Sequence, residues 1–287
     1  MTAAGGALAG KTVLVTGATS GIGLVTAEAL ANKGARTILG ARTEERAEQA
    51  RRRVSALNED VHAVVADLSS RSAVLEMARE VAARFDRLDV LINNAGIDVG
   101  RRVVTADGLE LTFAVNYMAP FLLTNGLRGL MRASSPARVL NVASSGYRGG
   151  KLDFDDLQSE RRFSGQRAYN NSKLALVLFT YELARRLAGS GVTANAVDPG
   201  FVRGTAIGRT LPIGYRVLGT LMWPLMASME KGAETVVWAA SDPSLADATG
   251  RYFKRSREIS TGPPTHDEDL AQRLWRASER LAGYGAA

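Results

Sequence analysis

Cysteine is absent from this chain of 287 residues, and histidine occurs only at His62 and His266. The absence of cysteine excludes disulfides, thiolate nucleophiles and Cys-ligated zinc or iron–sulfur centres. A catalytic triad or a metal site built on histidine has little to draw on, because one His lies in a strand-like apolar run and the other in a proline-rich loop. We therefore expect no resident metal, and the composition fits a reducing compartment, which we take to be the cytoplasm.

The chain also lacks an apolar run long enough to span a bilayer. Met1 to Gly10 is small and uncharged, without the basic start and long apolar core of a signal peptide. The longest apolar stretch further along, Val217 to Ala227, is short and is interrupted by Pro224. We expect no stable membrane anchor, although this stretch suits either the lining of a pocket or a contact with a membrane surface.

Basic residues outnumber acidic ones by 36 to 29, which gives a formal net charge of +7. Such an excess is typical of a nucleic-acid partner when the basic residues share one face. Here the basic clusters are dispersed and mostly interleaved with acids, from Arg51–Arg53 to Lys254–Arg257. We expect no nucleic-acid partner, whereas an anionic cofactor can benefit locally from these charges.

Short apolar, β-branched runs alternate with helical patterns from end to end. Strands are expected at Lys11–Thr16, Arg36–Leu39, Val61–Ala66, Asp89–Asn93, Arg138–Ala143, Val192–Val197 and Arg251–Phe253. Helices are expected at Gly21–Lys33, Glu44–Leu57, Ser70–Phe85, Leu109–Arg132, Gln166–Ala188, Glu230–Ala240 and, after a capping-box spacing of Thr265 and Glu268, up to Leu281. This alternation predicts an α/β protein with a doubly wound parallel sheet, the Rossmann fold, covered by helices on both faces.

No linker or repeat divides the sequence, so we expect residues 1–287 to form a single domain. Two segments, 146–165 and 201–229, do not fit the alternation. Insertions into such sheets tend to cover ligands, because ligands bind outside the carboxyl ends of the strands. Residues 201–229, after the sixth strand, are therefore a candidate substrate lid.

A glycine-rich turn joins the first expected strand to the first helix. Glycines there let the backbone turn sharply and approach a pyrophosphate, which then lies against the N–H groups of a helix N-terminus. A tight turn without a ligand is the alternative, but the strand–turn–helix context favours a dinucleotide site. The expected binding residues of this turn are Gly17, Thr19, Ser20, Gly21, Ile22 and Gly23.

The end of the second strand indicates which dinucleotide is bound. Folds of this kind that prefer NAD usually place an acid there to bind the ribose 2′-hydroxyl. This chain has Ala41 and Arg42 instead. Because an Arg side chain pairs well with a 2′-phosphate, the sequence favours NADP over NAD; the alternative is that Arg42 is a surface residue at the start of the next helix.

Tyr169 and Lys173 are four residues apart in an expected helix and so share one of its faces. A free Tyr ionises at a pKa of about 10, and a fixed positive charge nearby stabilises its phenolate. The pair is therefore a candidate acid–base centre. Two such residues also meet by chance, as a surface Lys above a packed Tyr, so this interpretation depends on the rest of the chain.

These motifs together resemble the short-chain dehydrogenase/reductase family over nearly the whole chain. Further family motifs occur in the family's order: Asp67, Asn93-Asn94-Ala95-Gly96, Asn116, Ser144-Ser145, Tyr169 to Lys173 and Pro199-Gly200. Finer stretches, at 105–110, 121–124, 172–187 and 273–275, resemble its retinol-dehydrogenase-like branch.

Two residues depart from that branch. Asp198 precedes Pro199 where many members have His, and Thr205 lies one position later than the family's usual Thr. We also expect no membrane-anchoring N-terminus of the kind that many retinoid enzymes carry. The resemblance therefore does not establish a retinoid substrate.

The resemblance implies hydride transfer between a nicotinamide cofactor and a carbonyl or alcohol, with Tyr169 as the acid–base group. Lys173 is expected to lower the pKa of this Tyr and to bind the nicotinamide ribose. Ser145 is expected to bind the substrate oxygen, because the second Ser of such a pair is the family's usual catalytic one, while Ser144 ends the strand. Asn116 is expected to kink its helix and hold a water that relays protons to Lys173, unless it is simply a buried, satisfied amide. The further cofactor contacts implied are Asp67, Leu68, Asn93, Ala95, Gly96, Tyr169, Lys173, Pro199, Gly200, Val202 and Thr205.

The segment 205–229 holds an apolar set that suits a lipophilic small-molecule substrate better than a sugar or hydroxy acid. Its members are Leu211, Ile213, Tyr215, Val217, Leu218, Leu221, Met222, Trp223 and Leu225. A core helix or an oligomer contact is an alternative use of such residues. We therefore expect a carbonyl reductase or alcohol dehydrogenase. The rival functions are a non-catalytic NADP(H)-binding redox sensor and a tailoring enzyme with a non-redox outcome such as epimerisation.

The run Leu174 to Phe179 is more apolar than one core-facing stripe requires. Members of the family often dimerise through this helix. The resemblance therefore implies a homo-oligomer, a dimer or a tetramer.

Overall fold

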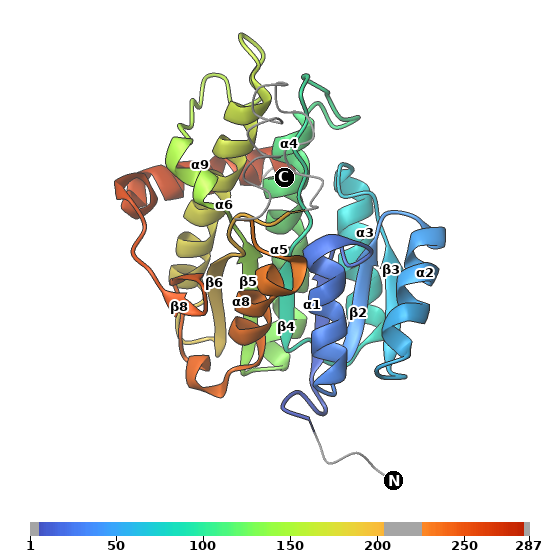
Figure 1. Ribbon diagram of the computed structural model, residues 1–287. Coiled ribbons are helices and arrows are strands. Elements are labelled where there is room, and N and C mark those ends of the chain that lie inside the picture. The colour runs from blue at the N-terminus through green and yellow to red at the C-terminus, as the bar shows by residue number, and fades with distance from the viewer. Residues whose placement is uncertain (1–5, 204–225, 284–287) are drawn as a thin grey trace.

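The computed structural model describes residues 6–203 and 226–283, and within these ranges the strands form one eight-stranded sheet in the order β3-β2-β1-β4-β5-β6-β7-β8 (Figure 1). The strands are β1 Thr12–Thr16, β2 Arg36–Ala41, β3 Val61–Val65, β4 Val90–Asn93, β5 Ala137–Val142, β6 Val192–Asp198, β7 Tyr252–Lys254 and β8 Arg257–Glu258. All neighbouring pairs are parallel except β7 and β8.

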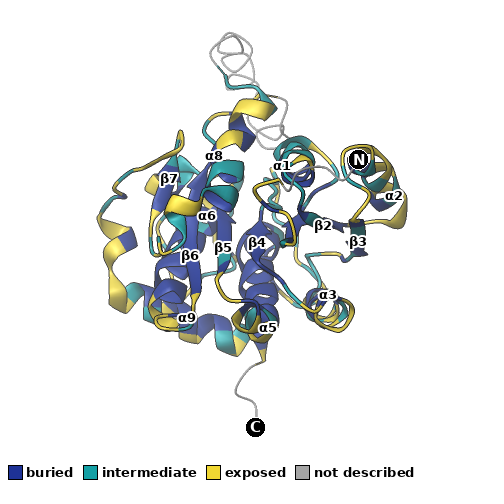
Figure 2. Cartoon of the chain, turned by 90° about the horizontal axis from the view of Figure 1, so that it is seen from below, coloured by how far each residue is buried: buried dark blue, intermediate teal, exposed yellow. Residues whose placement is uncertain are grey.

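Helices cover both faces of the sheet. They are α1 Gly21–Asn32, α2 Glu44–Ser55, α3 Arg71–Arg84, α4 Leu111–Phe113, α5 Ala119–Ala133, α6 Gly165–Arg186, α8 Met229–Ser241 and α9 Glu268–Ala282. One buried apolar cluster includes residues of α3, α5, α6 and α9, and a second includes residues of α1, α2 and α8. Figure 2 shows α1, α2 and α8 on one side of the strands and α3, α5 and α9 on the other. The expected doubly wound fold is confirmed.

The central strands are apolar on both sides because both sides are covered. Leu14 of β1 belongs to one apolar cluster, while its neighbours Val13 and Val15 belong to the other. All three side chains are fully buried, and burial of each stabilises the fold by about 1.5–3 kcal/mol. Successive side chains of a strand point to opposite faces, so continuous apolar runs of this kind are typical of covered parallel strands.

The strand order reverses beside β1. The chain builds β2 and β3 on one side of it, then crosses to place β4 on the other. Loops at the carboxyl ends of β1 and β4 therefore diverge and leave a crevice between them. The glycine-rich turn after β1 and the Asn93-to-Gly96 segment after β4 face each other at this point.

Three local features differ from the sequence-based expectation. The short strand β8 returns antiparallel to β7 through Arg255 and Ser256, which both have positive φ. The expected helix over 109–132 contains a π-helix, η1 (Ala114–Met118), between α4 and α5. The expected capping box at Thr265 is wrong: Asp267 caps α9, because Thr265 is held within the preceding 3₁₀ turn by its bonds to Thr261 and Gly262.

The apolar run Leu174–Phe179 is buried within the chain along α6. Trp275 of α9 stacks on Phe179, with ring centroids 5.7 Å apart, and meets Phe121 of α5 edge-on at 5.1 Å. The helix that suggested a subunit contact is thus covered by α9, and the homo-oligomer stays a prediction. Across residues 6–203 and 226–283, none of the helices has both the length and the apolarity needed to cross a membrane.

Asp89, 3% exposed just before β4, ties the start of β1 to the start of β4. Its carboxylate accepts hydrogen bonds from the Lys11 ammonium at 2.9 Å, from the backbone N–H of Thr12 at 2.9 Å, and from two nitrogens of Arg87. Burial alone would raise the pKa of Asp89, but these bonds outweigh burial and lower it. Because the folded pKa is lowered, the resulting stabilisation is present above the ordinary carboxyl pKa and is lost as the pH falls through the lowered value.

We expect Asp89→Asn to lower the free energy of unfolding by about 2 kcal/mol near neutral pH, because it leaves two cations without their shared partner. The deficit should start to shrink as the pH falls below the ordinary carboxyl pKa of about 4, and it should vanish once the pH has passed through the lowered pKa of Asp89, where the wild-type carboxylate is itself protonated. Urea unfolding across this pH range measures both effects. The control is Glu76→Gln, which removes an exposed partner of Arg79 and should cost less than about 0.5 kcal/mol. A deficit independent of pH would contradict the assignment.

Candidate active site

Tyr169 and Lys173 lie one turn apart on α6 and are 8% and 3% exposed. The Lys173 ammonium lies 5.8 Å from the centroid of the Tyr169 ring. It donates a hydrogen bond of 2.8 Å to the carbonyl of Val142, the last residue of β5. The spacing on α6 thus brings phenol and ammonium together at the carboxyl edge of the sheet.

Burial shifts the protonation of both groups. Burial lowers the pKa of Lys173 to about 8, and the nearby Asp198 carboxylate acts in the opposite direction. Burial also raises the pKa of Tyr169; the charges of Asp198 and Asp98 raise it further, while a hydrogen bond with Ser144 acts to lower it. The phenol is therefore held in its protonated form, from which it can donate a proton.

The two serines after β5 face different partners. The Ser144 side chain lies close enough to Tyr169 to lower the pKa of the phenol. The adjoining Gly146 is so close that a Cβ added there would lie 3.2 Å from the Tyr169 ring and 3.5 Å from the Ser144 hydroxyl. Ser145 instead donates a 2.5 Å hydrogen bond to Asp198. Ser145 begins the 3₁₀ helix η2 (Ser145–Gly149), so its side chain points to β6 and not to Tyr169.

Asn116 lies in the π-helix η1 and is fully buried. Its side chain bonds both peptide groups of Ile97, at 2.8 and 2.9 Å, and donates to the hydroxyl of Ser172 at 3.0 Å. A Cβ on Gly96 would lie 3.5 Å from the Asn116 oxygen and 3.6 Å from the Lys173 ammonium. Asn116 therefore fixes the loop after β4 against α6 within reach of Lys173. π-Helical turns of this kind are frequent at functional sites.

The turn after β1 has the backbone that its glycines predict. Gly17 and Gly21 have φ of 65° and 57°, in the left-handed region that favours glycine. A side chain on Gly23 is excluded, because its Cβ would lie 2.3 Å from the Asn94 amide and 2.4 Å from the carbonyl of Gly17. The Thr16 hydroxyl accepts the backbone N–H groups of Asn94 and Ala95, at 3.0 and 3.1 Å, and so joins this turn to the loop after β4.

The N-terminus of α1 is open, unlike several other helix starts. Side chains cap α2, α3, α8 and α9, whereas Ser20 makes no side-chain cap to α1. A Cβ on Gly21 would have no atom within 4 Å, apart from its chain neighbours and the backbone of its own helix. An uncapped helix start with exposed N–H groups and open space fits an anionic group such as a pyrophosphate. Thr19, Ser20 and Ile22 belong to this same start.

The other expected cofactor residues occupy the carboxyl edge from β2 to β6. Arg42 follows β2, is exposed, and makes no hydrogen bond or ion pair with another residue in the described part of the chain. Leu68, Asn93 and Ala95 line one small hollow. The Asn93 side chain itself is buried between Asn141 and Thr124, at 2.8 and 3.0 Å, and so contributes packing between strands.

Asp67, after β3, and the Pro199–Gly200 turn, after β6, lie at the two ends of this carboxyl edge of the sheet. Asp67 is exposed and accepts bonds from the backbone and hydroxyl of Ser69. Gly200 has a φ of 83° and donates its N–H to Asp198 at 2.8 Å. The turn after β6 is thereby fixed to the end of its own strand.

The two ends of the candidate lid segment are joined. Val202 and Ala227 form a parallel β-bridge, with backbone bonds of 2.9 Å from Arg203 to Ala227 and from Ala227 to Phe201. Val202 is buried against α8, since a Cβ on Gly232 of that helix would lie 2.6 Å from Val202 and 3.4 Å from Ile22 of α1. Thr205 and the apolar set at 211–225 lie outside the described residues.

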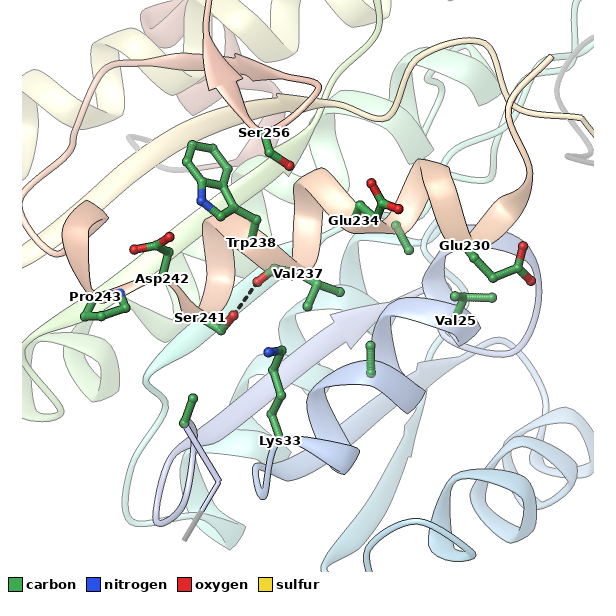
Figure 3. Close-up of a pocket in the computed structure, with 13 residues that line it drawn as sticks. Val25, Lys33, Glu230, Glu234, Val237, Trp238, Ser241, Asp242, Pro243 and Ser256 are labelled. Carbon is green, nitrogen blue, oxygen red and sulfur yellow. Dashed lines mark hydrogen bonds between the residues drawn. The ribbon is translucent and has the colours of Figure 1, made fainter. Parts of the chain in front are cut away.

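A groove of about 720 Å³ between α1 and α8 is separate from this site (Figure 3). Lys33, Glu234 and Trp238 are among the residues that line it; Figure 3 shows Glu234 and Trp238 on α8 and Lys33 just beyond the end of α1. None of the expected catalytic or cofactor residues lines this groove. The candidate site is therefore the edge described above.

Three charged or polar groups at the site were not predicted from the sequence. Ser144 was assigned to the strand end, and neither Asp98 nor Lys254 was singled out. Lys254 lies beside Asp198 because β7 pairs with β6, a register that no local pattern reveals. Asp98 is only two residues beyond the Asn93-to-Gly96 motif, and a carboxyl group beside a cofactor loop was a signal available in the sequence.

Comparison with known proteins agrees with this geometry. The short chain dehydrogenase family matches residues 11–214. The chain is similar to human retinol dehydrogenase 13, with 42% identity over 96% of this chain and 86% of that protein, and to human retinol dehydrogenase 14, with 41% identity over 97% and 88%.

Solved structures give the same match. An uncharacterized protein from Mycobacterium paratuberculosis has a TM-score of 0.78 and 31% identity over 96% of this chain and 94% of that one. A short chain dehydrogenase from Burkholderia cenocepacia J2315 in complex with NADP has a TM-score of 0.70 and 26% identity over 86% and 96%. The resemblance to the retinol-dehydrogenase-like branch is thereby confirmed.

We expect the Lys173 ammonium to titrate near pH 8 in the ligand-free protein, well below its ordinary value of 10.5, because burial disfavours its charge. Asp198→Asn should lower the midpoint further, since the carboxylate favours the ammonium. Side-chain NMR of labelled lysines, with the Lys173 signal assigned from Lys173→Arg, measures both midpoints. A Lys173 midpoint at the ordinary value of 10.5 would refute the assignment.

Proposed function

The chain belongs to the short chain dehydrogenase family, and we propose that it is an oxidoreductase that transfers a hydride between NADP(H) and the carbonyl or alcohol group of a lipophilic small molecule. One observation carries the proposal: a buried phenol, Tyr169, has a hydroxyl partner in Ser144 and an ammonium neighbour in Lys173. All three lie at the carboxyl edge where ligands bind in such sheets. Human relatives named retinol dehydrogenases support an alcohol or carbonyl as the reacting group.

Tyr169 is the acid–base group. In reduction its hydroxyl gives a proton to the carbonyl oxygen, and in oxidation its phenolate takes the proton of the alcohol. Lys173 stabilises the phenolate through its charge, and the hydrogen bond to Val142 keeps the ammonium in place. The nicotinamide, when bound, supplies or accepts the hydride.

Ser144, in place of the expected Ser145, is the donor to the substrate oxygen. Its hydroxyl lies close enough to Tyr169 to act on the pKa of the phenol, so a substrate oxygen placed between the two side chains meets both hydroxyls at once. A positioned donor stabilises charge that develops on the oxygen in the transition state. Ser145 is occupied by Asp198 and Lys254 and is assigned a supporting role.

The cofactor fits the residues that are present. The open start of α1 at Ser20 suits the pyrophosphate, and Gly96 leaves room for a ribose close to Lys173. Arg42 follows β2, and no carboxylate among the described residues is bonded to its guanidinium, which is therefore available for a 2′-phosphate. The structurally similar Burkholderia enzyme in complex with NADP supports this preference.

A lipophilic substrate is supported by the residues that follow the Pro199–Gly200 turn. Phe201 is 66% exposed directly after this turn, and the sequence 211–225 is rich in large apolar residues. Apolar side chains around a few convergent polar groups are typical of sites for apolar ligands. A redox sensor or an epimerase is not favoured, since a sensor has no need of three converging catalytic groups.

We expect Tyr169→Phe to lower kcat/KM by about a thousandfold for any carbonyl that the wild type reduces with NADPH, because the proton donor is lost. Binding of NADPH should change little, since the phenyl ring preserves the packing. Spectrophotometric turnover with a panel of apolar aldehydes and ketones, with NADPH affinity measured by fluorescence titration, tests the proposal. Tight NADPH binding without turnover by the wild type would favour the sensor instead.

The two serines provide a matched pair of controls. Ser144→Ala should lower kcat by about a hundredfold or more, because it removes a donor to the reacting oxygen. Ser145→Ala should lower kcat by much less at the pH optimum. The reverse order of effects would restore Ser145 as the substrate-binding serine.

We expect Arg42→Ser to raise the KM for NADPH by about tenfold or more and to leave the KM for NADH nearly unchanged, because only NADPH carries the 2′-phosphate. Steady-state kinetics with each cofactor and the best substrate measure the split. Arg52→Ser is the control, since that Arg lies at the far end of α2 and pairs with Glu48. Equal losses with both cofactors would contradict the role.

A further inference from the structure

A buried network of charged and polar groups lies behind the catalytic hydroxyls and takes no part in the chemistry proposed above. Asp198 at the end of β6 is 1% exposed. One carboxylate oxygen accepts bonds from Ser145 at 2.5 Å, Lys254 at 3.0 Å and Tyr252 at 3.1 Å. The other accepts the N–H of Gly200 at 2.8 Å. Lys254 also donates to Ser145 at 2.6 Å, so three side chains form a closed triangle.

The pairing of strands places the two charges together. Asp198 and Lys254 are register partners on the parallel strands β6 and β7, and their side chains point to the same face. The Lys254 side chain is 26% exposed and the Asp198 side chain 2%. Lys254 is therefore the more exposed partner of a carboxylate that is itself buried.

Asp198 is held ionised in spite of its burial. Burial alone would raise its pKa, but the hydrogen bonds from Ser145, Lys254 and Gly200, together with the charge of Lys254, outweigh burial and lower it. A negative charge is thus fixed close enough to raise the pKa of both Tyr169 and Lys173. Without a counter-charge, this carboxylate would oppose the phenolate that the proposed reaction requires.

The other charged groups around Tyr169 do not supply that counter-charge. Asp98, in the loop after β4, is a second carboxyl group that raises the pKa of Tyr169, and one of its buried oxygens has no partner among the described residues. Lys173, on α6, is the cation of the catalytic pair. Arg148, in η2, acts electrostatically on Asp198 but is hydrogen-bonded to Tyr147 and exposed to solvent. Tyr252 donates its hydroxyl to Asp198, and burial raises the pKa of this hydroxyl, so it supplies no charge.

We propose that Lys254 is a positioning residue: its ammonium balances the charge of Asp198 behind the catalytic hydroxyls, and so sets the pH range in which Tyr169 exchanges its proton. The same triangle fixes Ser145 and, through the peptide chain, the adjoining Ser144. Because Asp198 also holds Gly200, one carboxylate orients the segments that follow β5 and β6. The proposal rests on the proposed function because it takes Tyr169 as the catalytic group. The effect of Lys254 on the pKa of Tyr169 can nevertheless be measured without any catalysis.

The experiment follows the proton on Tyr169 directly. Protein labelled with fluorotyrosine is titrated by fluorine NMR, and the Tyr169 signal is assigned by its absence in Tyr169→Phe. We expect Lys254→Met to raise the midpoint of Tyr169 by about one pH unit, because Asp198 stays ionised without its counter-charge. Asp198→Asn should lower the midpoint, and the double variant Asp198→Asn/Lys254→Met should return close to wild type. Lys254→Arg, which keeps the charge, should restore most of the wild-type midpoint.

Lys231→Met is the matched control, because it removes an exposed ammonium paired with Glu234 at 2.6 Å on α8. It should leave the Tyr169 midpoint unchanged. Circular dichroism of each variant verifies folding; should Lys254→Met fail to fold, Lys254→Gln replaces it in the same comparison. A Lys254→Met midpoint equal to that of Lys231→Met, in folded protein, would overturn the proposal.

Kinetics then separates this inference from the proposed function. With a substrate in hand, the pH profile of kcat/KM for alcohol oxidation should move to higher pH in Lys254→Met by the same amount as the NMR midpoint. A purely structural role would lower kcat at all pH values without moving the profile, and would count against the proposal. Absence of turnover by the wild type would refute the proposed function. The fluorine NMR titration would still show whether Lys254 shifts the midpoint of Tyr169.

Discussion

The hydrogen bond from the Lys173 ammonium to the carbonyl of Val142 is the interaction on which the site depends. It holds a buried cation at the end of β5, and α6 then carries Tyr169 to a place one turn away. A buried ammonium without a partner would carry a desolvation cost of several kcal/mol. The bond meets part of this cost, and the lowered pKa of Lys173, about 8, measures the part that remains. Small changes in local charge therefore have large effects on proton transfer here.

The charges around Tyr169 and Lys173 have opposite effects on the proton of Tyr169. Asp198 and Asp98 favour the phenol of Tyr169, whereas in the proposed mechanism the charge of Lys173 favours the phenolate. Both effects are stronger than they would be in water, because the low local dielectric weakens screening. The balance between them decides at which pH the proton moves, and Lys254 acts on Asp198, a carboxylate that is buried and held ionised. Ser145, which we expected to bind the substrate, is bonded instead to Asp198 and Lys254.

The sequence predicted the parts of the site that depend on local geometry. The spacing of Tyr169 and Lys173 on one helix, and the glycines of the turn before α1, are set by the backbone within a few residues. What the sequence did not predict depends on contacts between distant segments. Lys254 meets Asp198 only because β7 adds to β6 in one register, and Trp275 covers α6 only because α9 returns across it.

The choice between Ser144 and Ser145 shows how narrow the margin is. Counting from the serine pair selected the second serine, but the structure is set by where β5 ends and η2 begins, at Val142 and Ser145. A shift of one residue turns a side chain toward the opposite side of an extended segment. The sequence predicted that the strand ends at Ala143, one residue beyond its actual end at Val142. An error of one residue is enough to leave open which hydroxyl faces Tyr169.

The uncapped N-terminus of α1, where we propose that the cofactor binds, also leaves polar groups without a partner in the free protein. A serine at a helix N-terminus usually caps it and contributes about 1 kcal/mol, and Thr43, Ser70 and Ser228 do so elsewhere in this chain. Ser20 does not, so the first N–H groups of α1 remain available and the free protein lacks that stabilisation. An anionic ligand that binds there satisfies these groups only in the folded state, and by mass action it stabilises the fold in proportion to its occupancy. The local loss of stability at α1 is thus the physical counterpart of an affinity for phosphate.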